Sequence, residues 1–257
     1  MKLKDRVAVV TGGGSGIGAG ICLAFGREGA PVAVADIDLS AAEKTAAEIR
    51  QQGGRAAAWR FDVSDRQAVE AAADEIEAKL GPIEIWVNNA GISLVMPFLD
   101  CSEKDWDATL RINLKGAYLG CQAAIRRMLP RKRGVILNMS SQSGKAGNSQ
   151  YAAYCASKFG VIGLTQSLAV EFARSNIRVN ALCPGVVFTP LWDKMIDDYA
   201  RKRNMKREEV KPYLESKIPL GRLCTPEDVA ETAVFLASDA ASYLTGQAIN
   251  ISGGALM

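Results

Sequence analysis

Seven short apolar segments recur along this chain of 257 residues, and longer amphipathic segments separate them. The apolar segments are rich in Val, Ile and Ala on both faces, which is typical of strands buried in a parallel sheet. The predicted strands span 6–11, 31–36, 56–62, 83–89, 134–141, 177–183 and 247–253. Because helical patterns such as 39–52 and 65–80 lie between them, the sequence predicts an α/β fold with a doubly wound, seven-stranded parallel sheet and helices on both faces.

Composition excludes several classes of function. A net charge of +3 and a pI of about 8.5 are too small for the basic face of a nucleic-acid-binding protein, so no nucleic-acid partner is expected. No apolar run reaches the ~18 residues that would span a bilayer, and the first residues lack a signal-peptide core. We therefore expect a cytoplasmic protein with no membrane partner.

The chain has no histidine, and its six cysteines are scattered singly, without a Cys-x-x-Cys pair. This pattern favours reduced thiols over a disulfide framework. A zinc site would lack its usual nitrogen and paired sulfur ligands, so we expect no metal. Any chemistry must come from other side chains.

A glycine-rich turn, with Gly12, Gly16 and Gly18, directly follows the first predicted strand and opens a helix. Glycines there let the backbone approach a pyrophosphate, which the helix N-terminus stabilises through free N–H groups. The Gly-Lys-Ser/Thr ending of a nucleotide P-loop is absent. The pattern predicts a dinucleotide site, the alternative being a structural turn.

Asp36 ends the second predicted strand, 18 residues after Gly18, where a carboxylate can accept hydrogen bonds from the adenosine ribose hydroxyls. It would repel a 2′-phosphate, so the cofactor predicted is NAD rather than NADP. The alternative is a helix N-cap, a role that Asp38 or Ser40 could fill instead.

Six sequence features occur in order along essentially the whole chain and together resemble the short-chain dehydrogenase/reductase family. They are the glycine turn TGGGSGIG, the stretch from Asn88 to Gly91, Asn113, Ser141, Tyr154 with Lys158, and Pro184-Gly185. The resemblance implies a single Rossmann domain, residues 1–257, that oxidises alcohols or reduces carbonyls without a metal.

The resemblance also implies roles for individual residues. The implied catalytic residues are Asn113, Ser141, Tyr154 and Lys158. The cofactor-binding residues are Gly12, Ser15, Gly16, Ile17, Gly18, Asp36, Asp62, Val63, Asn89, Ala90, Gly91, Tyr154, Lys158, Pro184, Gly185, Val187 and Thr189. Taken singly, Ser141 could equally cap a strand end, and Asn113 could bind a neighbouring turn.

Tyr154 and Lys158 stand four residues apart in a predicted helix, so they share one face. A neighbouring ammonium favours the phenolate, and the oxidised nicotinamide adds positive charge. We therefore expect a Tyr154 pKa lowered toward working pH, which would let the phenol act as general base or acid without histidine.

Five residues are predicted to contact the substrate: Ser141, Gln142, Asn148, Tyr154 and Trp192. The set is similar to that of butanediol and acetoin dehydrogenases, in which the two amides meet a vicinal diol; the alternative is that both amides tie down their own loop. A predicted helical excursion at about 190–217 resembles sorbitol-6-phosphate and related sugar-alcohol dehydrogenases and would cover the substrate. Its basic run at 201–207 could bind a phosphate or be a solvated helix face.

The predicted substrate is thus a polyol, a vicinal diol or the matching ketone. A 3-oxoacyl-[acyl-carrier-protein] reductase is the alternative enzyme, but such enzymes usually prefer NADP and carry a basic residue where this chain has Ser15. A non-catalytic dinucleotide-sensing protein should have lost Tyr154, Lys158 or Ser141. Apolar stripes at 102–129 and 151–173 lead us to expect, by resemblance, a homotetramer.

Overall fold

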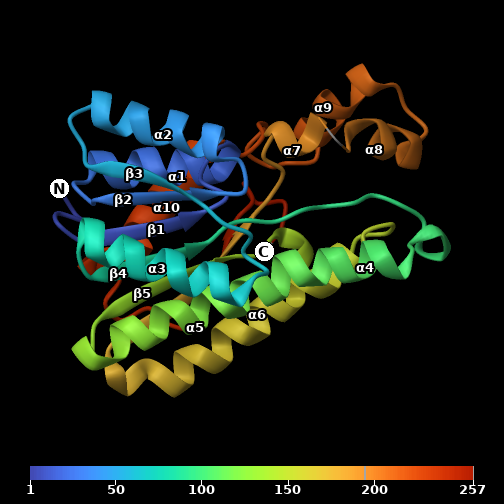
Figure 1. Ribbon diagram of the computed structural model, residues 1–257. Helices are drawn as coiled ribbons and strands as arrows, with labels where there is room; N and C mark the ends of the chain where they lie inside the picture. The colour runs from blue at the N-terminus through green and yellow to red at the C-terminus, as the bar shows by residue number, and fades with distance from the viewer. Residues whose placement is uncertain (194, 257) are drawn as a thin grey trace.

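Seven parallel strands form the centre of the computed structural model, which describes residues 1–193 and 195–256 (Figure 1). The strands are β1 (Val7–Thr11), β2 (Val32–Asp36), β3 (Ala56–Arg60), β4 (Ile83–Asn88), β5 (Gly134–Met139), β6 (Ile177–Pro184) and β7 (Ala248–Ile251). Their order in the sheet is β3-β2-β1-β4-β5-β6-β7. The predicted doubly wound, seven-stranded parallel sheet is therefore confirmed, with strand ends displaced by at most two residues.

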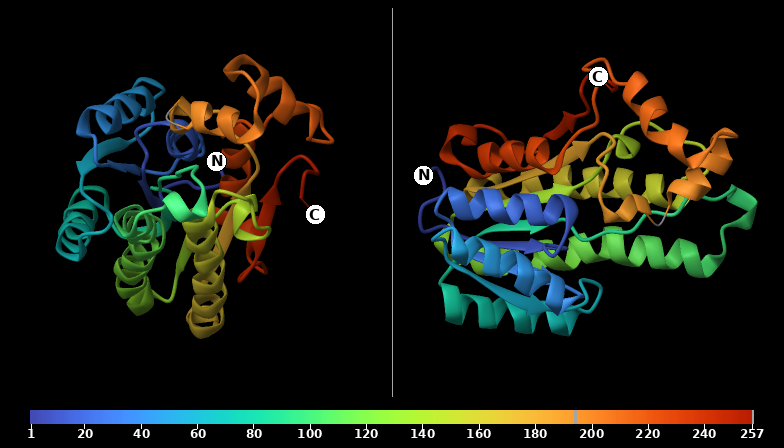
Figure 2. Two further views of the ribbon diagram at one scale, coloured as in Figure 1. Left: turned by 90° about the vertical axis from the view of Figure 1, so that its right-hand side faces the viewer. Right: turned by 90° about the horizontal axis from the view of Figure 1, so that it is seen from above.

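Helices cover the two faces of the sheet as separate layers (Figures 1 and 2). One layer contains α1 (Gly16–Arg27), α2 (Leu39–Gln51) and α10 (Pro226–Ala237). The other contains α3 (Arg66–Leu80), α4 (Glu103–Leu110), α5 (Gly116–Met128) and α6 (Ala152–Phe172). A π-helical turn, η2 (Arg111–Lys115), joins α4 to α5, and the short 3₁₀ helices are η1 (Phe98–Asp100), η3 (Leu129–Arg131), η4 (Gln142–Gly144), η5 (Ala173–Ser175) and η6 (Asp239–Ala241).

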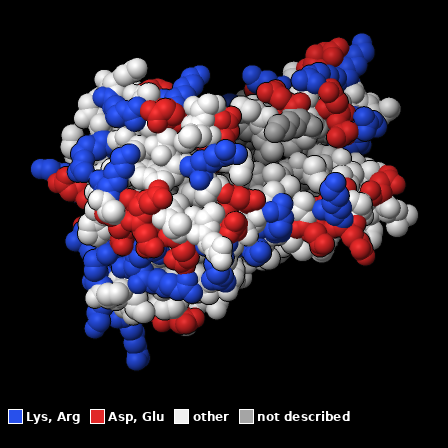
Figure 3. Space-filling view, viewed as in Figure 1, with Lys and Arg blue, Asp and Glu red and all other residues white. Residues whose placement is uncertain are grey.

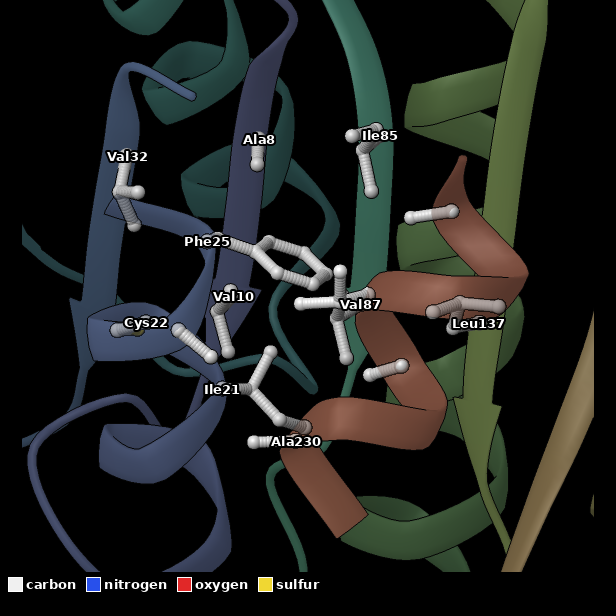
Figure 4. Close-up of a cluster of buried hydrophobic side chains, with 14 of the residues drawn as sticks. Ala8, Val10, Ile21, Cys22, Phe25, Val32, Ile85, Val87, Leu137 and Ala230 are labelled. Atoms are coloured by element: carbon white, nitrogen blue, oxygen red, sulfur yellow. The ribbon is translucent and has the colours of Figure 1, made fainter. Parts of the chain in front are cut away.

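The first layer is held by a core between α1, α10 and the central strands (Figure 4). Ile21 and Phe25 of α1 lie over Val10 and Val87 and meet Ala230 of α10, and none of these side chains is more than 1% exposed. Burying a side chain of this size contributes roughly 1.5–3 kcal/mol. The packing fixes α1 on β1, and with it the glycine turn that joins them.

In the second layer, a chain of buried polar groups ties α6 to the sheet. Asn88 accepts a hydrogen bond from Trp86 Nε1 at 2.8 Å and donates to Asn138 Oδ1 at 2.8 Å. Asn138 then donates to Thr165 Oγ1 at 3.0 Å. Thr165 lies two turns after Lys158 on the same face of α6, so these bonds help to set the position of that lysine.

The segment predicted to be a helical excursion contains α7 (Pro190–Asp193), α8 (Ile196–Arg203) and α9 (Arg207–Ser216) between β6 and α10. It has an apolar cluster of its own, which includes Trp192, Tyr199, Val210 and Leu214. Tyr151, just before α6, belongs to the same cluster. The excursion therefore packs against the start of the helix that carries Tyr154. None of the helices described here is long and apolar enough to cross a membrane.

Candidate active site

A cleft of about 490 Å³ lies at the carboxyl ends of the central strands. Every residue predicted to bind the cofactor lines it, together with Ser141 and Trp192. Lining residues that the sequence analysis missed are Thr11, Ala35, Ile37, Phe61, Ile92, Ile112, Met139, Ser140, Pro190 and Leu191. Most of these are neighbours of predicted residues at strand ends, the edge at which open α/β sheets bind ligands.

The glycines of the turn after β1 leave no room for a side chain at their positions. Gly12 and Gly16 have φ of +63° and +53°, in the left-handed region that favours glycine. A Cβ on Gly18 would lie 2.0 Å from the Gly12 carbonyl oxygen. Ser15, the N-cap of α1, makes no side-chain capping bond. The first N–H groups of α1 are thus available to an anion such as a pyrophosphate.

Asp36 lies in the cleft at the end of β2. Its carboxylate accepts hydrogen bonds from Gly14 N at 2.9 Å and from Asp38 N at 3.1 Å. Helix α2 is capped instead by Asp38, which accepts from the backbone N–H of Ser40 and of Ala41. A carboxylate has about four acceptor positions, so Asp36 keeps capacity for ribose hydroxyls.

The turn after β4 is hydrogen-bonded to the glycine turn after β1. Asn89 donates from Nδ2 to the carbonyl oxygens of Thr11 at 2.9 Å and of Gly12 at 3.2 Å. Thr11 Oγ1 in turn accepts from Asn89 N and from Ala90 N, at 3.0 and 3.1 Å. These bonds join the two strand ends that form the floor of the cleft.

Tyr154, Lys158 and Ser141 meet in the same cleft, the first two on α6 and the third just after β5. The Ser141 hydroxyl neighbours the Tyr154 phenol, where it favours the phenolate. Lys158 Nζ donates to the Met139 carbonyl oxygen at 2.8 Å and lies 5.6 Å from the centroid of the Tyr154 ring. An acid/base pair and a hydroxyl donor therefore face one space.

The pKa of Tyr154 in the protein without nucleotide is set mainly by burial. Burial raises it above its usual value, and the neighbouring Ser141 hydroxyl only partly opposes this. Burial also lowers the pKa of Lys158, to about 8. Desolvation penalises both charged forms, so the lysine alone does not make the phenol acidic, and the lowered pKa expected with bound oxidised nicotinamide stays a prediction.

Asn113 is buried in the π-helical turn and does not line the cleft. Its side chain accepts from Ile92 N at 2.8 Å and donates to Ile92 O at 2.9 Å and to Ser157 Oγ at 3.0 Å. Ser157 Oγ donates to the Tyr154 carbonyl oxygen at 2.7 Å. Asn113 thus links the loop after β4 to the first turn of α6. The sequence analysis missed Ser157, although its position three residues after Tyr154 was a usable signal.

The predicted substrate residues separate into two groups. Trp192 lines the cleft and stacks on Phe188, with ring centroids 4.9 Å apart and planes within 8°. Gln142 and Asn148 are not among the lining residues. Asn148 Oδ1 instead accepts from Lys202 Nζ at 2.8 Å. A partner 54 residues away leaves no local signal in the sequence.

The basic side chains at 201–207 do not gather around one site. Arg201 pairs with Asp198 at 2.7 Å and Arg207 with Asp197 at 2.8 Å. Figure 3 shows acidic and basic side chains interspersed over this part of the surface. Only Lys202 turns toward the loop before α6. The arrangement favours a solvated, ion-paired helix face over a phosphate site.

The chain is similar to known proteins over nearly its whole length. Residues 12–255 match a family model described as enoyl-(acyl carrier protein) reductase. D-threitol dehydrogenase of Mycolicibacterium smegmatis is 42% identical over 98% of this chain and 94% of its own length. A 3-oxoacyl-[acyl-carrier-protein] reductase of Thermotoga maritima is 39% identical over 99% of both chains.

A solved structure of sorbitol-6-phosphate 2-dehydrogenase from Erwinia amylovora superposes with a TM-score of 0.94 at 37% identity, covering 97% of this chain and 99% of that one. The chain therefore belongs to the short-chain dehydrogenase/reductase family, whose cofactors are NAD or NADP. It is an oxidoreductase acting on CH–OH groups.

The raised pKa of Tyr154 can be tested directly. Without nucleotide, we expect the phenol to titrate above its ordinary value of 10.0, because burial disfavours the phenolate. Absorbance at the tyrosinate band, compared between wild type and Tyr154→Phe across the alkaline range, isolates this residue. Ionisation of Tyr154 below its ordinary pKa in the free protein would contradict the prediction.

Proposed function

We propose that this protein is an NAD-dependent dehydrogenase that interconverts a secondary alcohol of a polyol or vicinal diol and its ketone. The observation that carries the proposal is the convergence of Tyr154, Lys158 and Ser141 in a cleft that also contains the glycine turn and Asp36. The similarity to D-threitol dehydrogenase supports a polyol substrate.

The residues of the cleft fit NAD. The glycine-rich turn and the open N-terminus of α1 suit a pyrophosphate. Asp36 would accept from the ribose hydroxyls, and its charge would repel a 2′-phosphate. Asp62 and Val63 would hold the adenine, and Thr189 the carboxamide of the nicotinamide. Bound NAD supplies the hydride acceptor and, in its oxidised form, a positive charge beside the phenol.

In oxidation, Ser141 would hold the reacting hydroxyl while Tyr154 accepts its proton. Lys158 would bind the nicotinamide ribose, since its ammonium has three donors and Met139 O takes one. The positive charge of the cofactor would lower the Tyr154 pKa, which burial alone raises. Asn113 would complete the proton relay through ordered water bound at its main chain, because its side chain is occupied.

A second hydroxyl on the substrate would be recognised by Gln142 and Asn148. Among the described residues, the Gln142 side chain has no hydrogen-bond partner. Its amide oxygen lies 3.5 Å from the point where a Cβ on Gly185 would stand, and Gly185 lines the cleft. This proximity to a cleft residue supports the proposed contact.

A 3-oxoacyl-[acyl-carrier-protein] reductase is the second candidate, because a relative with that activity is 39% identical. Ser15 and Asp36 argue against it, since neither would favour the 2′-phosphate of NADP. A non-catalytic, dinucleotide-sensing role is disfavoured because Tyr154, Lys158 and Ser141 are all present and adjacent.

We further propose a single catalytic domain that acts as a cytoplasmic homotetramer. Large apolar side chains stand exposed on α5 and α6: Tyr118 at 38%, Phe159 at 46% and Val170 at 82%. Burying them against a second subunit would remove this apolar surface from water. The six free cysteines fit a reducing compartment.

Replacing Tyr154 by Phe should lower kcat by about 10²- to 10⁴-fold, because the ring is preserved and only the proton-transferring hydroxyl is lost. NADH binding, measured by fluorescence titration, should change little. Tyr243→Phe, at a fully exposed tyrosine, is the matched control. A Tyr154→Phe enzyme with more than about a tenth of wild-type turnover would overturn the catalytic assignment.

Asp36→Asn keeps the side-chain shape and an acceptor for Gly14 N but removes the charge. The wild type should prefer NAD in kcat/KM, and the variant should narrow that preference by about tenfold, or ~1.4 kcal/mol. The measurement is kcat/KM for both cofactors. Equal or better use of NADP by the wild type would favour the 3-oxoacyl reductase alternative.

Polyols and vicinal diols should be better substrates than 2-butanol, because a missing hydroxyl leaves buried amides unpaired at a cost of roughly 1–3 kcal/mol per group. This corresponds to about five- to 150-fold in kcat/KM. A panel of D-threitol, sorbitol, galactitol, sorbitol 6-phosphate and 2,3-butanediol tests it, and Gln142→Ala should shrink the difference. If 2-butanol or a 3-oxoacyl thioester is the better substrate, the substrate assignment is wrong.

A further inference from the structure

Lys202 differs from the other cations of the excursion because it binds a distant loop. Its Nζ donates to Asn148 Oδ1 at 2.8 Å and to Ser149 O at 2.6 Å. The same atom lies 4.7 Å from the ring centroid of Tyr151 and 5.6 Å from that of Tyr199. One side chain of α8 thus contacts most of the turn at 148–151, which leads into α6.

That turn is strained and is held from two directions. Gln150 has φ of +63°, in the left-handed region, which is unfavourable for a residue other than glycine. Its carbonyl oxygen accepts from Met96 N at 3.0 Å, and the preceding carbonyl, of Ser149, accepts from Lys202. Tyr151, the N-cap of α6, makes no side-chain capping bond. Besides its own backbone bond from Tyr151 N to the Asn148 carbonyl oxygen, at 3.3 Å, the turn is thus held by bonds from other segments.

The turn leads directly to the reacting group. The Tyr151 ring meets the Tyr154 ring edge-on, with centroids 6.1 Å apart and planes at 61°. Tyr151 is also in the apolar cluster of Trp192, which lines the cleft. Because Lys202 occupies the amide oxygen of Asn148, the N–H groups of that amide are its free donors, with no partner among the described residues.

We propose that Lys202 is a positioning residue for substrate binding: it holds the turn at 148–151 against α8 and orients the Asn148 amide so that its N–H groups can donate to a substrate hydroxyl. The inference rests on the proposed function for the identity of the substrate. Lys202 would act on substrate binding through its hydrogen bond with Asn148. Lys202 touches neither the cofactor cleft nor the reacting atoms.

The test is Lys202→Met in the full-length enzyme, measured with the alcohol that the wild type oxidises best. We expect KM for the alcohol to rise about tenfold or more, with kcat changed less than about threefold and the Kd for NADH, from fluorescence titration, within about twofold. Lys211→Met is the control, because it removes the same charge from an exposed position on α9. A KM equal to that of the control would overturn the proposal.

A double-mutant cycle with Asn148→Ala shows whether Lys202 acts through that amide. The loss in the double variant should be smaller than the sum of the two single losses, because both substitutions remove the hydrogen bond between Lys202 and Asn148. Additive effects would overturn the proposal, as would a loss confined to sorbitol 6-phosphate, which would instead make Lys202 a phosphate contact. If Lys202→Met does not fold, Lys202→Gln, which keeps a donor, takes its place in the cycle. The proposed substrate class is tested by the wild-type enzyme with the panel of alcohols, without any Lys202 variant. A failure of the Lys202 proposal is therefore distinguishable from a failure of the proposed function.

Discussion

The buried ammonium of Lys158 is the constraint on which the candidate site depends. The side chain is 4% exposed, and an unpaired buried charge is costly. The Met139 carbonyl at the end of β5 supplies one acceptor for its three donors. Burial lowers its pKa to about 8 and raises that of Tyr154. In the proposed mechanism, a bound nucleotide would supply the further acceptors and the positive charge that proton transfer by Tyr154 needs.

The position of that lysine is set by the rigid part of the fold. Helix α6 is held to β4 and β5 by the buried chain from Asn88 through Asn138 to Thr165. At its N-terminal turn, Asn113 and Ser157 fasten the Tyr154 carbonyl to the loop after β4. Small displacements at this point would misalign the phenol, and networks that satisfy every buried polar group restrict such displacements.

The substrate side of the cleft is built differently. It depends on the excursion of α7, α8 and α9, which packs as a separate cluster around Trp192 and Tyr151. Loops and insertions of this kind vary more readily than the strands that carry them. This division explains how relatives with polyol and 3-oxoacyl activities can both be about 40% identical to one chain. The proposed role of Lys202 would place one determinant of specificity in its hydrogen bond with Asn148.

The sequence by itself determined the sheet and the glycine turn, because these follow from local patterns, whereas the family resemblance implied that Tyr154, Lys158 and Ser141 meet. Strands buried on both faces read as short apolar runs, and glycine is required where φ is positive, as at Gly12. Tertiary structure alone decided that Asn148 binds Lys202, that the Asn113 side chain is occupied by Ile92 and Ser157, and that burial raises rather than lowers the Tyr154 pKa. These properties arise from contacts between residues distant in the chain and from the exclusion of water around them, and neither is encoded in the spacing of neighbouring residues.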